Sequence, residues 1–360
     1  MKKILIGGSP CTWWSCAKTS SQRETLPQGI GWELFLNFII AKEKFKPDYF
    51  LYENNKSISE PIKQQISREL DCDYIMINST LVSAQSRKRC YWHNIPDVTQ
   101  PDDRNILLRD ILESGITDSL KSYCLTASYS GAVISNTLSR KQRSMVYSPV
   151  LIGDIGSRSQ GYRVYSCDGK SVSICSRGGG LGSIAGLYLC PCDMNGSNVY
   201  YIKDNIINVN DVPYDINLPD GYYAVRKLSV TECCRLQTLP DDYCRVVSNS
   251  QAYKGLGNGW TAEVVIHILN YMNIPKDEEV VVLSMYDGIG TGRYCFDRLG
   301  YTNLRYYAYE IDKYAIKVSM SNYPDIKQCG DAFSVREFDW KLENYSLLYD
   351  VVSYSGKSGD

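Results

Sequence analysis

The amino-acid sequence predicts an α/β protein with a smaller, irregular β-rich insert. Short apolar runs alternate with helix-length stretches in residues 1–100, and the alternation returns after residue 280. Residues 105–225 differ from both ends because they are rich in Gly, Ser and Tyr and contain short segments of alternating polarity. The length of 360 residues fits one large domain and one smaller domain.

The first hundred residues carry the strand and helix signals of an α/β unit. The run Ile4-Leu5-Ile6 predicts a buried strand that ends in a glycine turn. Pro47 separates the first helix from the strand that follows it. We expect strands at residues 3–7, 48–53 and 74–78, and helices at residues 31–45 and 59–70.

A second α/β unit begins at residue 280, after a polar linker. The apolar run Val280–Leu283 predicts a strand, and the glycine loop Asp287–Gly292 leads into a helix that ends near Leu299. A further strand at Leu304–Tyr309 comes next. Between the insert and this unit we expect helices at residues 229–237 and 261–272.

Composition excludes several classes of protein. No apolar run approaches the roughly 18–20 residues of a membrane span, and no secretory signal precedes Gly7. The 14 cysteines are scattered without zinc-type spacing, so we expect reduced thiols, no metal and a cytoplasmic protein. The formal net charge is −1, but residues 83–180 carry 13 Lys and Arg against 8 Asp and Glu, which suits local phosphate contact.

Cys11 lies just after the first strand, where α/β proteins place reactive groups. The strand at residues 48–53 ends in Glu53, so we expect its carboxylate at the same edge of the sheet as the thiol. A thiol and a carboxylate without a nearby His motif argue against a cysteine protease. They suit an electrophilic ring that is hydrogen-bonded while sulfur adds to it. A small core cysteine is the alternative.

The segment Gln85-Ser86-Arg87-Lys88-Arg89 has two interpretations. It can be a solvated basic run, which is the more common state of such a segment. Alternatively, Gln85, Arg87 and Arg89 lie on one side of an extended chain, where they grip a base carbonyl and phosphates.

The glycine loop after residue 286 is typical of a cofactor site. Its spacing Asp287-Gly288-x-Gly290-x-Gly292 differs from G-x-G-x-x-G, which disfavours a dinucleotide pyrophosphate. Glu310 ends the next strand, where an acid binds ribose hydroxyls in doubly wound folds. Asp331 lies one strand later and can accept from an adenine amino group. The loop and the two acids favour an adenosine-containing ligand without a diphosphate, and a plain strand–helix turn is the alternative.

These segments together resemble the ordered motifs of DNA cytosine-5 methyltransferases. The matches extend over almost the whole chain outside the insert. They comprise Pro10-Cys11, Glu53-Asn54, Gln85-x-Arg87-x-Arg89, Arg226-x-Leu228-Ser229-x-x-Glu232-x-x-Arg235-Leu236-Gln237-x-x-Pro240-Asp241, Gly257-Asn258 and the Asp287 loop with Glu310 and Asp331.

Two positions depart from the usual family pattern. Asn55 replaces the Val of the family's Glu-Asn-Val motif. Asn258-Gly259-Trp260 replaces the usual Asn-Ser-Val and resembles the eukaryotic de novo branch of the family. By that resemblance, Trp260 covers the adenine face of the methyl donor.

The resemblance implies a Rossmann-like sheet, the methyl donor S-adenosyl-L-methionine and a double-stranded DNA substrate. A cytosine flipped out of the duplex is attacked at carbon 6 by Cys11, while Glu53 bonds the base edge. Arg89 holds the base carbonyl, Gln85 and Arg87 order the site, and Ser15 and Asn54 contact the substrate. The implied donor contacts are Tyr286, Asp287, Gly288, Gly290, Thr291, Glu310, Ile311, Asp331, Asn258 and Trp260.

The insert then corresponds to the family's target-recognition domain. We assign residues 106–253 to it, and residues 1–105 and 254–360 to the catalytic domain. By the resemblance, the loops of the target-recognition domain read bases in the major groove. Candidate readers are Arg140, Lys141, Arg143, Arg158 and Arg177, each of which can instead be a solvated surface residue. Arg226, Glu232 and Arg235 are expected to stabilise the insert rather than take part in chemistry.

The order of the motifs is unusual. In the family the donor loop normally comes first, whereas here the Pro-Cys half leads and the donor half ends the chain. The chain therefore resembles a circular permutant, in which the Ile4–Ile6 strand lies centrally between elements from both ends. The tail at residues 341–360 has no assigned role.

Two alternatives stay open. An RNA cytosine methyltransferase shares the chemistry, but an insert of about 150 residues is more typical of a groove-reading module. A non-catalytic DNA-binding relative is disfavoured because every catalytic position is present. We expect a monomer of prokaryotic or phage origin, acting in restriction–modification or phage protection.

Overall fold

The computed structural model describes residues 1–15, 23–150, 164–165, 187–188 and 199–338. A seven-stranded sheet forms the larger body, with the strand order β14-β13-β12-β1-β2-β4-β3. All neighbours are parallel except at β4, which runs antiparallel to both β2 and β3. The strands are β1 (Lys2–Gly7), β2 (Tyr49–Asn55), β3 (Tyr74–Asn78), β4 (Lys88–His93), β12 (Val280–Met285), β13 (Leu304–Tyr309) and β14 (Lys327–Gly330).

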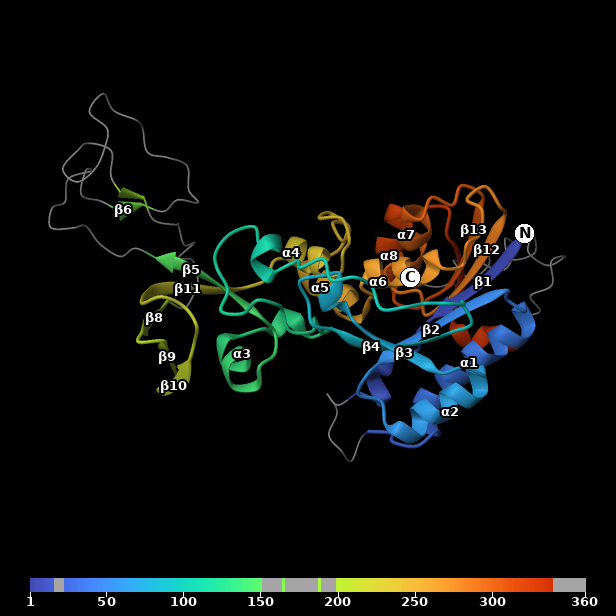
Figure 1. Ribbon diagram of the computed structural model, residues 1–360, viewed down its shortest axis with the longest axis horizontal. Coiled ribbons are helices and arrows are strands. Elements are labelled where there is room, and N and C mark those ends of the chain that lie inside the picture. Colours follow the sequence, from blue (N-terminus) through green and yellow to red (C-terminus); the bar gives the residue numbers. More distant parts are fainter. Residues whose placement is uncertain (16–22, 151–163, 166–186, 189–198, 339–360) are drawn as a thin grey trace, which may run out of the picture.

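Strand β1 lies at the centre of this sheet, as the motif order predicted. On one side it pairs with β2, the next strand in the sequence, and Ile4 lies opposite Tyr49. On its other side it pairs with β12 from the far end of the chain, where Ile4 lies opposite Val282. Figure 1 shows the two ends of the sequence side by side in this sheet.

Helices cover both faces of the sheet because its central strands are apolar on both sides. Ile4 and Ile6 point into one core, shared with α6 and α7, whereas Leu5 points into the other, shared with α1 and α2. The helices are α1 (Gly29–Phe45), α2 (Glu60–Leu70), α3 (Ile134–Arg140), α4 (Val230–Leu236), α5 (Asn249–Asn258), α6 (Ala262–Asn270), α7 (Thr291–Arg298) and α8 (Lys313–Asn322). The α/β class predicted from the sequence is confirmed, with a Rossmann-like sheet.

The insert forms a second, antiparallel sheet at the other end of the molecule (Figure 1). Its strand order is β10-β9-β8-β11-β5, and α3 packs on it through Ile134. The strands are β5 (Met145–Val150), β8 (Val199–Lys203), β9 (Ile206–Val209), β10 (Val212–Asp215) and β11 (Gly221–Lys227), with a separate parallel pair of β6 (Val164–Tyr165) and β7 (Leu187–Tyr188). The predicted β-rich character of the insert is therefore confirmed for the described residues.

Residues 228–258 pack against the large sheet, although the sequence analysis placed most of them in the insert. Leu228, Cys233 and Leu236 share a core with Ile4 and Val282. The expected boundary after residue 253 falls inside α5, which the sequence analysis did not predict as a helix. The division into domains stays a prediction.

Two classes of feature are absent from the residues that the structure describes. No described helix combines the length and apolar character needed to cross a membrane. Within the same residues, no three His, Cys, Asp or Glu side chains gather as metal ligands.

Candidate active site

The Pro10-Cys11 loop leaves the central strand and rests on a buried hydrogen-bond cluster. Cys11 is partly exposed and begins a short 3-10 helix, η1 (Cys11–Trp13). Beneath it, Ser9 Oγ lies 2.6 Å from Tyr52 Oη, and Asn54 Nδ2 donates to the Ser9 carbonyl at 3.2 Å. Burial raises the pKa of the Tyr52 hydroxyl well above its usual range, so this hydroxyl stays neutral. The cluster fixes the loop that carries the thiol.

Glu53 lies beside this loop with both carboxylate oxygens occupied. It is 8% exposed, and Arg89 Nε on the neighbouring strand β4 lies 2.9 Å from its Oε1. The indole Nε1 of Trp260 donates to Oε2 at 2.9 Å. A Cβ on Gly8 would lie 2.8 Å from the Glu53 carbonyl oxygen, so only glycine allows this close approach.

The three candidate residues of the Gln85–Arg89 segment differ in whether they line the cavity. Arg89 and Arg87 line the cavity that contains Cys11, whereas Gln85 does not. Gln85 is fully buried; its Oε1 accepts from Leu125 N at 2.7 Å and its Nε2 donates to Leu236 O at 3.2 Å. Gln85 therefore joins three chain segments behind the cavity.

Arg87 also ties segments together, although it lines the cavity. Its guanidinium donates to the carbonyls of Leu125 at 2.9 Å, Gly257 at 3.1 Å and Gly259 at 2.7 Å. Burial lowers the pKa of Arg87. The three carbonyls belong to the start of the insert and the end of α5, so Arg87 holds both against β4.

Cys124 lies outside the lining of the cavity but contacts both of its arginines, which the sequence analysis did not predict. Its Sγ lies 3.4 Å from Arg87 Nη1 and 3.8 Å from Arg89 Nη2. Burial alone would raise the pKa of the Cys124 thiol, but the two guanidiniums outweigh burial and lower it. No spacing in the sequence links Cys124 to the arginines, because the contact depends on how the chain folds back after β4.

The glycine loop after β12 turns in strained backbone and ends at α7. Positive φ values occur at Tyr286 (62°), Gly288 (62°) and Gly290 (80°). Gly288 N donates to Glu310 Oε2 at 2.8 Å, and Glu310 Oε1 accepts from the amides of Ile311 and Asp312. The predicted juxtaposition of the Asp287 loop with Glu310 is therefore present in the fold.

Asp287 is the most perturbed carboxylate of the site. Its Oδ1 accepts from Tyr306 Oη at 2.6 Å, while Oδ2 is buried and has no partner among the described residues. Burial raises the pKa of Asp287 to about 6, against the lowering effect of hydrogen bonds from the Tyr306 and Ser284 side chains.

The remaining predicted donor contacts surround the same loop. Ile311 is 72% exposed and Phe333 is 39% exposed, which leaves apolar surface beside Glu310. The Asp331 side chain caps η7 (Ala332–Arg336) by accepting from Phe333 N at 2.9 Å. The Tyr286 hydroxyl donates to Leu34 O on α1 at 2.7 Å, so its polar end is used by the scaffold.

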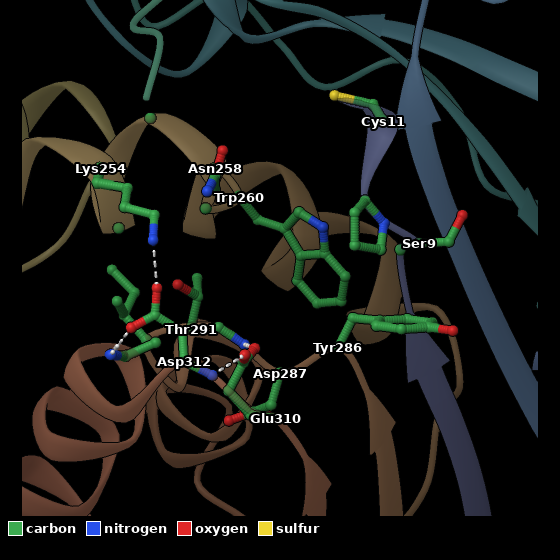
Figure 2. Close-up of a pocket in the computed structure, with 18 of the residues that line it drawn as sticks. Ser9, Cys11, Lys254, Asn258, Trp260, Tyr286, Asp287, Thr291, Glu310 and Asp312 are labelled. Atoms are coloured by element: carbon green, nitrogen blue, oxygen red, sulfur yellow. Dashed lines mark hydrogen bonds and ion pairs between the residues drawn. The ribbon is translucent and has the colours of Figure 1, made fainter. Parts of the chain in front are cut away.

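A single cavity of about 410 Å³ joins the thiol half to the glycine-loop half. Its lining includes Cys11, Glu53 and Arg89 from the first half of the site, and Asp287, Gly288, Thr291, Glu310, Ile311 and Asp331 from the second. Figure 2 shows Cys11 at one end, Asp287 and Glu310 at the other, and Trp260 between them. Gly290, which was also predicted as a donor contact, does not line it.

An ion pair that the sequence did not reveal spans the wall of this cavity. Lys254 Nζ on α5 lies 2.6 Å from Asp312 Oδ2 at the start of α8 (Figure 2). Both residues line the cavity and flank motifs that the sequence analysis named. The pair connects the segment before Trp260 to the segment after Glu310.

Apart from Asn54, the predicted substrate contacts that the structure describes do not line the cavity. Ser15 N donates to the Cys11 carbonyl at 2.8 Å, but Ser15 does not line the cavity. Arg140 and Lys141 are exposed at the end of α3, and Arg143 donates to the Gly131 carbonyl at 2.9 Å. Arg158, Arg177 and the tail at residues 341–360 lie outside the described residues.

Comparison with known proteins places this geometry in a family. The family model for C-5 cytosine-specific DNA methylases matches residues 1–273, which include Cys11, Glu53, Arg89 and Trp260. The chain is also similar to the type II methyltransferase M.HhaI of Haemophilus parahaemolyticus. The two are 26% identical over 291 residues, which cover 75% of this chain and 74% of the relative. Because the family model matches well over half of its length, the chain belongs to the C-5 cytosine-specific DNA methylase family and is a DNA cytosine-5 methyltransferase.

Proposed function

We propose that the protein transfers a methyl group from S-adenosyl-L-methionine to carbon 5 of a flipped-out cytosine in duplex DNA. A covalent bond between Cys11 and carbon 6 of the base is the intermediate. The observation that carries the proposal is the single cavity of about 410 Å³ that Cys11, Glu53 and the Asp287–Glu310 site share. Methyl transfer needs both partners held together in one site, and the shared lining of this cavity supports that arrangement.

The residues of the glycine-loop half fit the proposed donor. A buried Asp287 oxygen without a partner can accept from a donor group, and Gly288 has open space where a side chain would stand. Glu310 offers a carboxylate for ribose hydroxyls, while exposed Ile311 and Phe333 offer apolar surface for an adenine ring. When bound, S-adenosyl-L-methionine supplies an electrophilic methyl group on a sulfonium. Asn258, Thr291 and Asp331 complete the proposed contacts.

The thiol half supplies the groups that act on the base. The Cys11 thiolate forms a bond to carbon 6, and the electron pair of the carbon 5–carbon 6 double bond becomes available at carbon 5. Glu53 accepts from the exocyclic amine and shares a proton with ring nitrogen 3, where negative charge develops as sulfur adds. The proton returns to Glu53 when sulfur leaves. Arg89 holds the Glu53 carboxylate and the base carbonyl. Carbon 5 takes the methyl group as the methyl–sulfur bond breaks and its electron pair stays on the sulfur. The carbon 5 proton then passes to water, and the electron pair left behind expels the Cys11 thiolate.

Base flipping follows from where these groups lie. Glu53 is 8% exposed inside the cavity, and a stacked base in a duplex cannot bring its edge to it. We therefore propose that the antiparallel sheet and its loops hold the duplex while one cytosine enters the cavity. Arg140, Lys141 and Arg143 stay candidate contacts of that module.

We also propose that the chain is a circular permutant of the family architecture. The family model ends at residue 273, before β12, yet the predicted donor loop follows β12 and lines the same cavity as Cys11. Strand β12 pairs with β1 over six residues, from Lys2 opposite Val280 to Gly7 opposite Met285. The sheet is continuous although the proposed donor half comes last in sequence.

Trapping with duplex DNA that contains 5-fluorocytosine tests the proposal. Fluorine at carbon 5 cannot leave as the proton does, so the Cys11 adduct should persist and migrate as a protein–DNA complex in denaturing gels. Cys11→Ser should form no adduct. Cys72→Ser, a matched control at a partly exposed thiol outside the cavity, should trap like the wild type. No adduct on any duplex, or an adduct on RNA alone, would overturn the proposal in favour of a DNA-binding relative or an RNA enzyme.

A further inference from the structure

We infer that Trp260 is a positioning residue for the reaction, acting through the carboxylate of Glu53. The inference rests on the proposed function. The indole N–H and the Arg89 guanidinium together fix the plane of this carboxylate, so the base meets it in one orientation. Trp260 thereby does more than cover the methyl donor.

The contact is direct and lies inside the site. Trp260 Nε1 donates to Glu53 Oε2 at 2.9 Å, and Arg89 Nε lies 2.9 Å from Glu53 Oε1. The indole therefore donates to one carboxylate oxygen, and the Arg89 guanidinium forms an ion pair with the other. The absence of a side chain at Gly8 permits this arrangement, because a Cβ there would lie 3.0 Å from Oε2 and 3.5 Å from the indole nitrogen.

The loop that carries Trp260 is itself held at several points. Arg87 donates to the carbonyls of Gly257 and Gly259, at 3.1 Å and 2.7 Å. Gln237 Nε2 donates to Leu256 O at 2.5 Å, and its Oε1 accepts from Thr261 Oγ1 at 3.0 Å. These bonds lie on both sides of Trp260, so the indole projects from a fixed backbone.

The arrangement leaves a defined part of the carboxylate for the base. Each carboxylate oxygen has two acceptor directions; Trp260 occupies one on Oε2, while Arg89 forms an ion pair with Oε1. The remaining direction on one oxygen can accept from the amino group of a cytosine, and the other oxygen can contact ring nitrogen 3 when a proton is shared between them. Loss of the indole donor would let the carboxylate rotate, and small misplacements of a reacting group slow a reaction strongly.

Trp260 also lies between the two halves of the cavity. Figure 2 shows the indole between Cys11 and the Asp287–Glu310 end, with Asn258 two residues before it. The test therefore has to separate an effect of Trp260 on binding of the methyl donor from its effect on the Glu53 carboxylate. Trp260→Phe does this, because it keeps an aromatic ring and removes only the N–H donor.

The test compares Trp260→Phe with wild type in single-turnover methyl transfer and in the rate of adduct formation on 5-fluorocytosine DNA. We expect both rates to fall about tenfold, in line with the loss of a hydrogen bond to a charged acceptor. The dissociation constant for S-adenosyl-L-methionine, measured by calorimetry without DNA, should change less than twofold. Trp32→Phe, on α1 and outside the cavity, is the matched control and should leave all three values unchanged.

A double-mutant cycle with Glu53→Gln distinguishes action through Glu53 from a general loss of structure. In the Glu53→Gln background, Trp260→Phe should cost less than twofold, because there is no carboxylate left to orient. An equal loss in both backgrounds, unchanged rates, or a donor dissociation constant that rises with the loss in rate would overturn the inference. If wild type forms no adduct at all, the proposed function fails, and the inference fails with it; an adduct that Trp260→Phe leaves untouched defeats the inference alone.

Discussion

Single residues of the cavity differ in how far their polar atoms are satisfied. Glu53 and Arg87 have their charged groups bound by partners from the protein. Asp287 Oδ2 and Thr291 Oγ1, in contrast, are buried without a partner among the described residues. Buried polar atoms are normally paired, so these two atoms in the lining of the cavity are candidates for a ligand contact. The charged groups of the thiol half are already held by the protein, and we propose that the methyl donor pairs the free atoms of the glycine-loop half.

Asp287 should make stability depend on pH in a way that Asp287→Asn removes. Its pKa is raised to about 6 by burial, so the folded state binds more protons than the unfolded state between about pH 4 and pH 6. The contribution of Asp287 to the free energy of unfolding is therefore greatest below pH 4 and falls as the pH rises towards 6. At pH 8, Asp287→Asn should be more stable than wild type by about 1–2 kcal/mol.

Urea unfolding of both proteins at pH 5 and pH 8 measures this difference. The advantage of Asp287→Asn should shrink at the lower pH, where wild type is largely protonated at this site. Saturating S-adenosyl-L-methionine should reduce the advantage at pH 8 if the buried oxygen receives a donor from the ligand. A difference between the two proteins that is the same at both pH values would contradict the assignment.

Among the helices and strands, the sequence predicted best those that are buried on both faces. The strands β1, β12 and β13 were predicted because strands buried on both faces read as continuous apolar runs. Strand β4 (Lys88–His93) was missed as a strand because it begins with two charged residues, one of which serves the site. Helix α5 was missed because it contains Gly255 and Gly257, which weaken helix propensity.

The structure gives the reason for Gly257 in α5. A Cβ at this position would lie 2.2 Å from the backbone of Thr126. Tertiary packing of α5 on the segment around Thr126 therefore requires the residue that sequence rules count against a helix. The Glu53 contact of Trp260 was unpredictable for a related reason, since it joins residues from elements about 200 positions apart.

Glu232 joins strand β11 of the insert to helix α4 beneath the large sheet. It is fully buried, and its carboxylate accepts from Arg226 Nη1 and Nη2, both at 2.8 Å. It also accepts from Ser229 N at 2.8 Å, which completes a capping box, and from Glu113 N at 2.9 Å. The structure thus pairs Arg226 with Glu232, two of the residues that the sequence analysis expected to stabilise the insert.

Glu232→Gln should lower the free energy of unfolding by about 3 kcal/mol, because it leaves the Arg226 charge without its buried counterion. The rate of adduct formation at 20 °C should stay within about twofold of wild type, since Glu232 does not line the cavity. Asp242→Asn is the matched control, because its ion pair with Arg245 is 64% exposed on the Asp242 side and should be worth less than about 1 kcal/mol. Equal losses in the free energy of unfolding of the two variants, measured with urea, would show that the Glu232 network stabilises the protein no more than an exposed ion pair does.

At the scale of the whole molecule, the cavity depends on a meeting of the two chain ends. Its thiol half follows β1 and its glycine-loop half follows β12, and these strands are neighbours in the sheet. The family resemblance and its permuted motif order predicted this neighbourhood, because a permutation changes the chain ends and leaves the strands of the sheet in place. The sequence did not locate the insert boundary, since α4 and α5 pack on the large sheet through contacts that no local pattern encodes.

If the chain is a permuted form of the family architecture, a variant with the proposed donor half first should keep its fold and its activity. The variant opens the chain between Lys276 and Asp277 and joins residue 360 to Met1 through a short Gly-Ser linker. Both residues at the opening are exposed, and the β1–β12 ladder is left intact. The roughly 20 residues after 338 and the added linker can span up to about 70 Å when extended, which gives the new connection ample length.

The rearranged chain should trap 5-fluorocytosine DNA at a rate within about threefold of wild type and lose about 1–2 kcal/mol of stability, from a longer loop and the lost ion pair between the Met1 amine and Glu278. A second variant that opens the chain inside β12, between Val282 and Leu283, is the control. It should not fold, because it breaks a strand that is buried on both faces and pairs on both edges. Trapping rates and circular dichroism separate the outcomes. A soluble, folded Asp277-first chain that forms no adduct would mean that the order of the halves matters to the site itself, and the permutation would lose its support.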